Sequence, residues 1–178
     1  MEKFIITQKN NIWYGTFPAL EEAGFVNACS CRLHGKSDVV EGTLNLALHV
    51  GDDVEKVLRN RKAFAKAIGV DANCFTTCQQ VHGSKVVQVT KELVGSGAVA
   101  FTNTIADADA LITNLHDVPL MLFYADCVPV LLADLETGAY STDFYKKSKD
   151  WFSIILTTRY FPLTRKPVCR KLISPQNA

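Results

Sequence analysis

Two residues in this sequence have the side chains and the neighbours that suit metal binding or nucleophilic attack. His82 follows a predicted strand and precedes a glycine, so its ring can turn into a cleft. Cys127, with Asp126 before it, interrupts an apolar run in which a charge is costly unless it is paired or ligated. Together they allow either a thiolate–imidazole pair or a zinc site with nitrogen and sulfur ligands. A surface loop histidine and an inert buried thiol are the plain alternatives.

Other polar residues could complete such a site, but the sequence does not select among them. A catalytic zinc site usually has three protein ligands, and the spacing of His34, His49 and His116 favours none of them as the third. Asp107-Ala108-Asp109 is a second acidic pair, which either carries chemistry or makes the turn that enters a strand. The six cysteines form no C-x-x-C pair, which favours reduced thiols over disulfides or structural zinc.

The clearest element that could position these residues is an amphipathic helix from Asp53 to Ile68. Asp52 can cap its free N–H groups, Glu55 stands in the capping-box position, and Gly69 ends it. One face of this helix is apolar and consists of Val54, Val57, Leu58, Phe64, Ala65 and Ile68.

Short strand patterns occupy most of the remaining chain. We expect strands near residues 4–6, 12–14, 25–31, 75–78, 85–89, 110–113, 120–124 and 128–132, and the first two should form a hairpin around Gln8-Lys9-Asn10-Asn11. The last two runs are almost continuously apolar, which is typical of strands covered on both faces. Directly linked strands mixed with helices predict an α/β (α+β) fold, a single domain in which helices pack on a mixed β-sheet.

The composition is that of an ordinary globular protein. The chain has 178 residues, of which 48% are hydrophobic and 21% charged, and these values exclude disordered, collagen-like and coiled-coil chains. A formal net charge of +1 does not favour nucleic acid or an anionic membrane as a partner. No apolar stretch approaches the roughly 20 residues that span a bilayer, and no signal peptide precedes the first strand. We therefore expect a soluble, cytoplasmic monomer.

The charge of the chain changes sign near residue 140. Residues 141–178 hold eight basic and two acidic side chains, a net charge of +6, whereas the first 140 hold eleven basic and sixteen acidic ones, a net charge of −5. We therefore separate a divergent basic tail, residues 141–178, from the rest. A frameshift or a truncated gene would give such a break, and so would a genuinely diverged segment. We expect the tail to pack poorly and to leave the domain incomplete at its C-terminus.

Five motifs together resemble a known family. They are Ser30-Cys31-Arg32, Leu44-Asn45-Leu46 with His49-Val50-Gly51-Asp52-Asp53, Gln80-Val81-His82-Gly83, Asp107-Ala108-Asp109-Ala110, and Ala125-Asp126-Cys127-Val128-Pro129-Val130-Leu131. In this order they resemble the laccase-domain (multicopper polyphenol oxidase-like) purine nucleoside phosphorylases, also called the peptidoglycan editing factor family. The resemblance covers roughly residues 4 to 140, so residues 1–140 would be the N-terminal part of such a domain.

The resemblance implies a single α/β domain with a metal centre, usually zinc, with copper as the alternative. The first two family ligands map onto His82 and Cys127, which are then also the catalytic residues. The third family ligand is a histidine in a later H-A-G-W-R-G motif. That histidine would fall near Phe144, and no histidine follows His116 in this chain. A zinc site built from two residues would be much weaker than one built from three.

The activity that the resemblance implies is phosphorolysis of adenosine, inosine and methylthioadenosine to a free base and ribose 1-phosphate, with adenosine deamination beside it. Purine nucleoside and phosphate are then the partners. Arg32 is a candidate for holding the anion, and Asn45 for hydrogen bonding to sugar or base, although both could simply hold loops together. One alternative is a catalytically impaired, truncated homologue or binding protein. The other is a copper-dependent phenol oxidase or a cysteine hydrolase that uses the same site.

Overall fold

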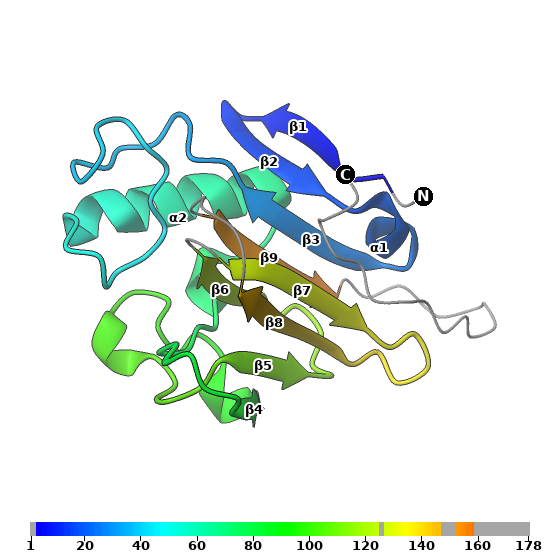
Figure 1. Cartoon of the computed structure of the whole chain (residues 1–178). Coiled ribbons are helices and arrows are strands. Elements are labelled where there is room, and N and C mark those ends of the chain that lie inside the picture. Colours follow the sequence, from blue (N-terminus) through cyan, green and yellow to red (C-terminus); the bar gives the residue numbers. More distant parts are fainter. Residues whose placement is uncertain (1–2, 125–126, 147–151, 159–178) are drawn as a thin grey trace.

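A helix and two β-sheets form three layers in this computed structural model, which describes residues 3–124, 127–146 and 152–158 (Figure 1). Helix α2 (Val54–Ile68) lies against one face of a five-stranded sheet, and a four-stranded sheet covers the other face. The predicted single domain with helices packed on mixed β-structure is therefore confirmed, with two sheets in place of one. Within the described part of the chain, no helix has the length and apolar character needed to cross a bilayer.

The five-stranded sheet is antiparallel throughout and has the order β1-β2-β3-β9-β6. Its strands are β1 (Ile5–Lys9), β2 (Ile12–Thr16), β3 (Phe25–Ser30), β6 (Leu120–Tyr124) and β9 (Phe152–Thr158). The predicted hairpin is confirmed, since Asn10 and Asn11 both have positive φ angles, 52° and 64°, as a two-residue turn between β1 and β2 requires. Short helix α1 (Pro18–Glu22) connects β2 to β3.

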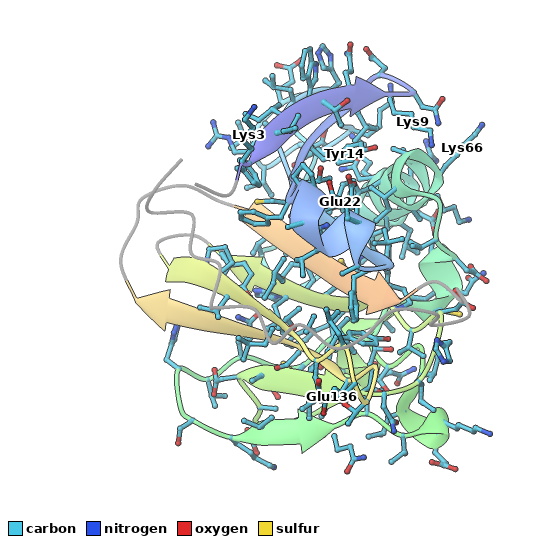
Figure 2. All side chains as sticks on the ribbon, turned by 90° about the vertical axis from the view of Figure 1, so that its right-hand side faces the viewer. Lys3, Lys9, Tyr14, Glu22, Lys66 and Glu136 are labelled. Carbon is cyan, nitrogen blue, oxygen red and sulfur yellow. The ribbon has the colours of Figure 1, made fainter. Side chains whose placement is uncertain are left out.

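One edge strand of this sheet is β1, and all five of its residues are exposed. Lys3 and Lys9 lie at its two ends (Figure 2). Charged residues beside an exposed strand oppose pairing with other molecules, so they protect this edge from aggregation.

The four-stranded sheet is mixed and has the order β4-β5-β8-β7. Its strands are β4 (Val86–Gln88), β5 (Ala110–Thr113), β7 (Cys127–Ala133) and β8 (Tyr140–Lys146), and only β4 and β5 run parallel. Three short 3₁₀ turns complete the described elements, at Ala72–Cys74, Lys91–Leu93 and Phe101–Asn103. The predicted strand at 75–78 is reduced to two isolated bridges, Thr76 with Leu120 and Cys78 with Ile105.

Strand β6 separates the two halves of the core. Leu120, Leu122 and Tyr124 point into the layer between the sheets, whereas Met121 and Phe123 point toward α2. Burial on both faces is what the continuous apolar run predicts, and it is confirmed for this strand.

Helix α2 is confirmed over almost the whole predicted range, with one correction at its start. The N-cap is Asp53, whose side chain accepts from the backbone N–H of Lys56 at 3.0 Å, and not Asp52. Asp52 does not cap the helix because its carboxylate accepts hydrogen bonds from the preceding loop. Val54 therefore lies at the exposed first position, and Gly69 ends the helix in the left-handed conformation.

Residues beyond 140 also require a correction. Strand β8 pairs with β5 and β7, and β9 lies between β3 and β6, so both segments occupy central places in their sheets. No strand was expected in residues 141–178, whereas residues 141–146 and 152–158 pair within the two sheets; the divergent tail itself stays a prediction. Net charge says nothing about backbone pairing, and the β-branched run within residues 152–158 has high strand propensity. Residues 159–178 of the predicted tail lie outside the described residues.

Candidate functional site

The loop that carries His82 is tethered to the end of β6 by the side chain of Gln80. The Gln80 Nε2 donates to the backbone oxygen of Phe123 at 3.0 Å, and the Phe123 N–H donates to Gln80 Oε1 at 2.8 Å. The side-chain amide thus pairs with the strand backbone as another strand would. Phe123 precedes Cys127 by four positions, so the anchor of the His82 loop is close to Cys127 along the chain.

A buried carboxylate holds the same loop from its other side. Asp109 is 2% exposed, and its two oxygens accept the backbone N–H groups of Val81, His82 and Gly83 at 2.7–2.9 Å. His82 itself is exposed and has a positive φ of 60°. The second acidic motif therefore shapes the loop through Asp109, a role that the sequence alone left open.

The contact between His82 and Cys127 stays a prediction. The backbone of Cys127 begins β7 and pairs with Lys146, but its side chain and residues 125–126 lie outside the described residues. Among the side chains that the structure does describe, no group of three or more His, Cys, Asp or Glu residues could hold a metal ion.

A cavity of about 190 Å³ opens beside the end of β6 and contains both predicted substrate-binding residues, Arg32 and Asn45. Its walls are mostly apolar, and it is lined by Ser30, Arg32, Ser37, Val39, Val40, Thr43, Leu44, Asn45, Leu46, Ala47, Val50, Phe123 and Tyr124. Phe123 thus belongs to the cavity wall and also anchors Gln80. The cavity and the His82 loop therefore meet at one residue of β6.

The polar atoms of Asn45 are directed at its own loop. Its Nδ2 donates to the Ala47 oxygen at 3.2 Å and to Asp52 Oδ2 at 2.8 Å, and its Oδ1 accepts the Ala47 N–H at 2.9 Å. One lone pair of Oδ1 is left for a ligand. Asn45 therefore lines the cavity, but most of its hydrogen bonds hold the loop.

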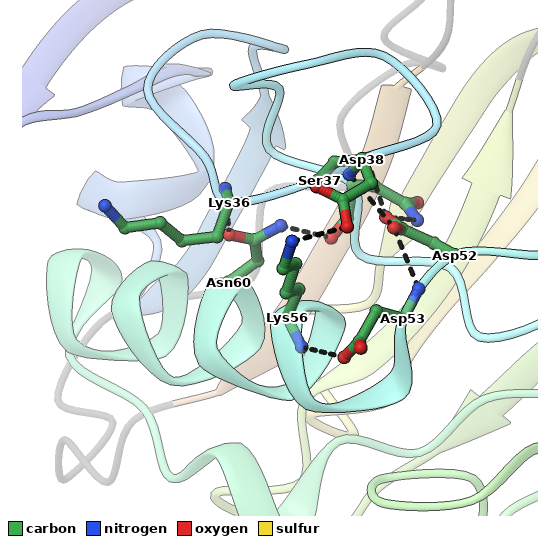
Figure 3. A network of polar contacts seen from close by, with 8 residues as sticks. Lys36, Ser37, Asp38, Asp52, Asp53, Lys56 and Asn60 are labelled. Carbon is green, nitrogen blue, oxygen red and sulfur yellow. Dashed lines mark hydrogen bonds and ion pairs between the residues drawn. The ribbon is translucent and has the colours of Figure 1, made fainter.

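Asp52 is the centre of a polar network that joins two walls of this cavity (Figure 3). Its carboxylate accepts from Ser37 Oγ at 2.6 Å, Asn45 Nδ2 at 2.8 Å, and the N–H groups of Asp38 and Asp53 at 3.1 and 2.9 Å. Burial works against ionisation of Asp52, but these hydrogen bonds outweigh it and lower the pKa of the carboxyl to about 2.

Two side chains of α2 support the same network. Lys56 forms an ion pair with Asp38, and Asn60 accepts the Lys36 N–H at 2.9 Å and donates to the Asn45 oxygen at 2.9 Å (Figure 3). These partners are more than ten positions apart in the sequence, so no local pattern could predict them.

Arg61 supports the cavity wall from behind. This side chain is 2% exposed and donates to the backbone oxygens of Leu46, Gly97 and Ala98 at 2.6–2.8 Å, and its guanidinium lies 5.6 Å from the ring centre of Phe123. Burial lowers the pKa of Arg61 to about 10. The predicted apolar face of the helix does not include this buried residue, because an arginine has no apolar signal.

The thiols whose side chains the structure describes are poorly suited to nucleophilic attack. Burial, aided by Cys31, raises the pKa of Cys29 to about 12, and burial, aided by Asp109, raises that of Cys78 to about 12. Burial also raises the pKa of Cys31 and of Cys74. A cysteine hydrolase built on one of these four residues is therefore disfavoured.

His49, one of the three histidines left open as a third ligand, has an aromatic environment. Its ring lies 5.4 Å from both Phe101 and Phe123, measured between ring centres. Burial, followed by the charge of Arg61, lowers the pKa of His49 and favours its neutral form.

Two curated relatives of this chain are both named purine nucleoside phosphorylases. The chain is 37% identical over 116 residues to the purine nucleoside phosphorylase YlmD of Geobacillus stearothermophilus, an alignment that covers 65% of this chain and 42% of the relative. It is 41% identical over 107 residues to a purine nucleoside phosphorylase of Mycobacterium bovis, covering 60% of this chain and 40% of that protein. The chain thus spans about two fifths of the length of these relatives.

Two solved structures have a fold similar to that of this chain. The crystal structure of YlmD from Geobacillus stearothermophilus matches with a TM-score of 0.73 and 31% identity, over 80% of this chain and 53% of that one. The Bacillus licheniformis protein YfiH matches with a TM-score of 0.70 and 25% identity, over 75% of this chain and 49% of that one.

The sequence profile of a family described as multi-copper polyphenol oxidoreductase laccase matches residues 26–142. This range contains all five motifs, the Arg32–Asn45 cavity and the tethered His82 loop. The chain therefore belongs to the multi-copper polyphenol oxidoreductase laccase family.

Proposed function

We propose that this chain binds a purine nucleoside and phosphate and acts in purine nucleoside phosphorolysis. In this reaction phosphate attacks C1′ of the ribose, the bond from C1′ to the purine nitrogen breaks, and the base leaves as it takes up a proton. The products are a free base and ribose 1-phosphate. Adenosine, inosine and methylthioadenosine are the proposed substrates, and adenosine deamination is a further proposed activity.

The observation that carries this proposal is the shared position of Phe123. The residue lines the cavity that contains Arg32 and Asn45, and its backbone anchors the loop that carries His82. A ligand in the cavity would therefore lie next to the proposed metal-binding loop. Names of the curated relatives support the same reaction class.

Arg32 is the proposed phosphate-binding residue. It is exposed and lines a cavity whose walls are mostly apolar, so its guanidinium would be the positive charge at this cavity. A guanidinium binds phosphate oxygens through paired, charge-assisted hydrogen bonds. The apolar side chains of Val39, Val40 and Phe123 would contact the purine ring and limit the access of water.

His82 and Cys127 are the proposed metal-binding and catalytic residues. An imidazole nitrogen and a thiolate sulfur form a donor set that zinc accepts, and copper accepts the same atoms, so the residues fit the proposed metal. Bound zinc would supply Lewis acidity and an activated water, as adenosine deamination requires. Asn45 has the smaller proposed role of offering one oxygen lone pair to sugar or base.

The test is an assay of the purified protein with adenosine and phosphate, read by chromatography of adenine and ribose 1-phosphate, together with zinc per chain by mass spectrometry. H82A should lose both the bound zinc and the turnover, whereas H116A, which changes another exposed loop histidine, should keep both. Equal turnover by H82A and the parent protein would contradict the proposal.

A second candidate, a catalytically impaired homologue that still binds nucleoside, is favoured by one observation. The sequence has no histidine after His116, so the third family ligand has no counterpart. On this reading zinc would be well below one per chain and turnover would be slight, while adenosine would still bind. Oxidation of a phenol by the copper-loaded protein would instead indicate a phenol oxidase.

A further inference from the structure

We propose that Asp109 and Gln80 are positioning residues that fix the backbone of His82 at the end of β6 and thereby set the affinity for zinc. This inference rests on the proposed function, because it assumes that His82 binds the metal. It adds two residues that belong to neither the proposed ligands nor the cavity wall.

Asp109 binds the backbone of the His82 loop. Three consecutive backbone N–H groups, those of Val81, His82 and Gly83, converge on one carboxylate that is 2% exposed. Successive N–H groups of this kind form a concave anion-binding site, which here is filled by a side chain of the same protein. A buried carboxylate is tolerated because all three contacts satisfy it.

The loop has an unusual backbone conformation at His82. His82 has a φ of 60°, which is uncommon for a residue with a side chain and persists only where the surroundings enforce it. A Cβ atom at Gly83 would lie 3.2 Å from Asp109 Oδ2, so a glycine allows the loop to approach the carboxylate closely. The histidine and the glycine of the motif therefore both depend on Asp109.

Gln80 provides a second tether, independent of Asp109. Its amide pairs with the N–H and the oxygen of Phe123, so the loop is held at the end of β6 as well as at the entry to β5. Two anchors, one on β6 and one just before β5, fix both the position and the direction of the loop. Groups that orient a metal ligand in this way typically change metal affinity by about 10–100-fold when they are removed.

The experiment compares two pairs of nearly isosteric variants. D109N cannot satisfy all three N–H groups, because one of its two acceptor positions becomes an NH₂ donor, and D107N makes the same change at an exposed aspartate two positions away. Q80E loses the donor to the Phe123 oxygen, and Q79E is its exposed neighbour. Zinc affinity is measured by competition with a zinc-responsive dye, and amide hydrogen exchange is measured at residues 81–83 in the metal-free proteins.

We expect D109N and Q80E to weaken zinc binding by about 10–100-fold, and D107N and Q79E to change it by less than about twofold. D109N should also accelerate amide exchange at residues 81–83 at least tenfold, while exchange in α2 stays unchanged. The inference is overturned if D109N and Q80E both bind zinc as tightly as the parent. If the parent binds no zinc, the proposed metal site is wrong, and unchanged exchange at residues 81–83 in D109N would then separately overturn the positioning role.

Discussion

At the scale of single residues, Asp52 shows how one carboxylate can organise a binding cavity. It holds Ser37 on one wall and Asn45 on the other, although it does not line the cavity itself. Ser37 is only 2% exposed, so its hydroxyl depends on this contact. A ligand that enters the cavity meets walls whose spacing Asp52 has already fixed.

D52N should be less stable than the parent protein near neutral pH by about 1–3 kcal/mol, because the amide accepts fewer of the four hydrogen bonds. The pKa of Asp52 in the folded protein is about 2, below the ordinary value of about 4. Its stabilising effect is therefore complete above about pH 4 and is lost as the pH falls toward 2. Urea unfolding at pH 5 and pH 2.5 should show a larger acid-induced loss in the parent than in D52N.

The matched control for D52N is E41Q, which neutralises an exposed acid of the same loop region. Its stability should differ from that of the parent by less than about 0.5 kcal/mol at pH 5. An identical acid-induced loss in the parent and D52N would show that Asp52 is not the group responsible.

R32A should weaken phosphate binding by about 10–100-fold, the range expected when a charge-assisted hydrogen bond is lost. Titration calorimetry with inorganic phosphate measures this without any need for turnover. R59A removes an exposed arginine of α2 and should leave the phosphate affinity unchanged. If both variants bind phosphate as the parent does, the anion site lies elsewhere.

At the scale of elements, local sequence patterns predicted most of what the structure contains. The hairpin turn at Asn10-Asn11, helix α2 and the apolar strand β6 each depend on neighbouring residues, and each is confirmed. The cap of α2 was misplaced by one residue because Asp52 binds Ser37, fifteen positions earlier in the chain. A contact of that kind leaves no periodic trace in a sequence.

In the candidate site too, short motifs could be predicted from the sequence, whereas contacts between distant residues could not. The motif around His82 could be recognised, and Arg32 and Asn45 do line one cavity. The acceptor role of Asp109 and the amide pairing of Gln80 could not be predicted, because both partners lie more than twenty positions away.

D53A should destabilise the protein by about 1 kcal/mol, because the N–H of Lys56 loses its capping acceptor at the start of α2. E55A, in the first turn of the same helix, lacks this capping role and should cost less than about 0.5 kcal/mol. Urea unfolding followed by circular dichroism measures both. A loss with E55A that equals the loss with D53A would contradict the assigned cap.

At the scale of the whole molecule, the five-stranded sheet depends on its fourth strand. Strand β9 pairs with β3 on one side and with β6 on the other, and no other described strand joins these two. Strands β3 and β6 are thus held together through backbone hydrogen bonds from residues 152–158.

A chain that ends at residue 146 should therefore lose its cooperative unfolding transition and aggregate, because β3 and β6 would each expose an unpaired edge. A chain that ends at residue 158 keeps β9 and is the control. Thermal unfolding and size-exclusion chromatography distinguish the two. A monomeric, cooperatively folding chain of residues 1–146 would show that β9 is dispensable.

The place of β9 also has a consequence for the order in which the protein can fold on the ribosome. Phe25 pairs with Thr158, and Tyr124 pairs with Phe152. Strands of this sheet that are synthesised early therefore cannot complete their pairing until β9 has been synthesised. While translation continues, β3 and β6 of the nascent chain lack the partner that joins them. Sequence-distant pairing of this kind slows folding, so nascent chains of this protein should be clients of chaperones that shield strand edges until Thr158 has left the exit tunnel.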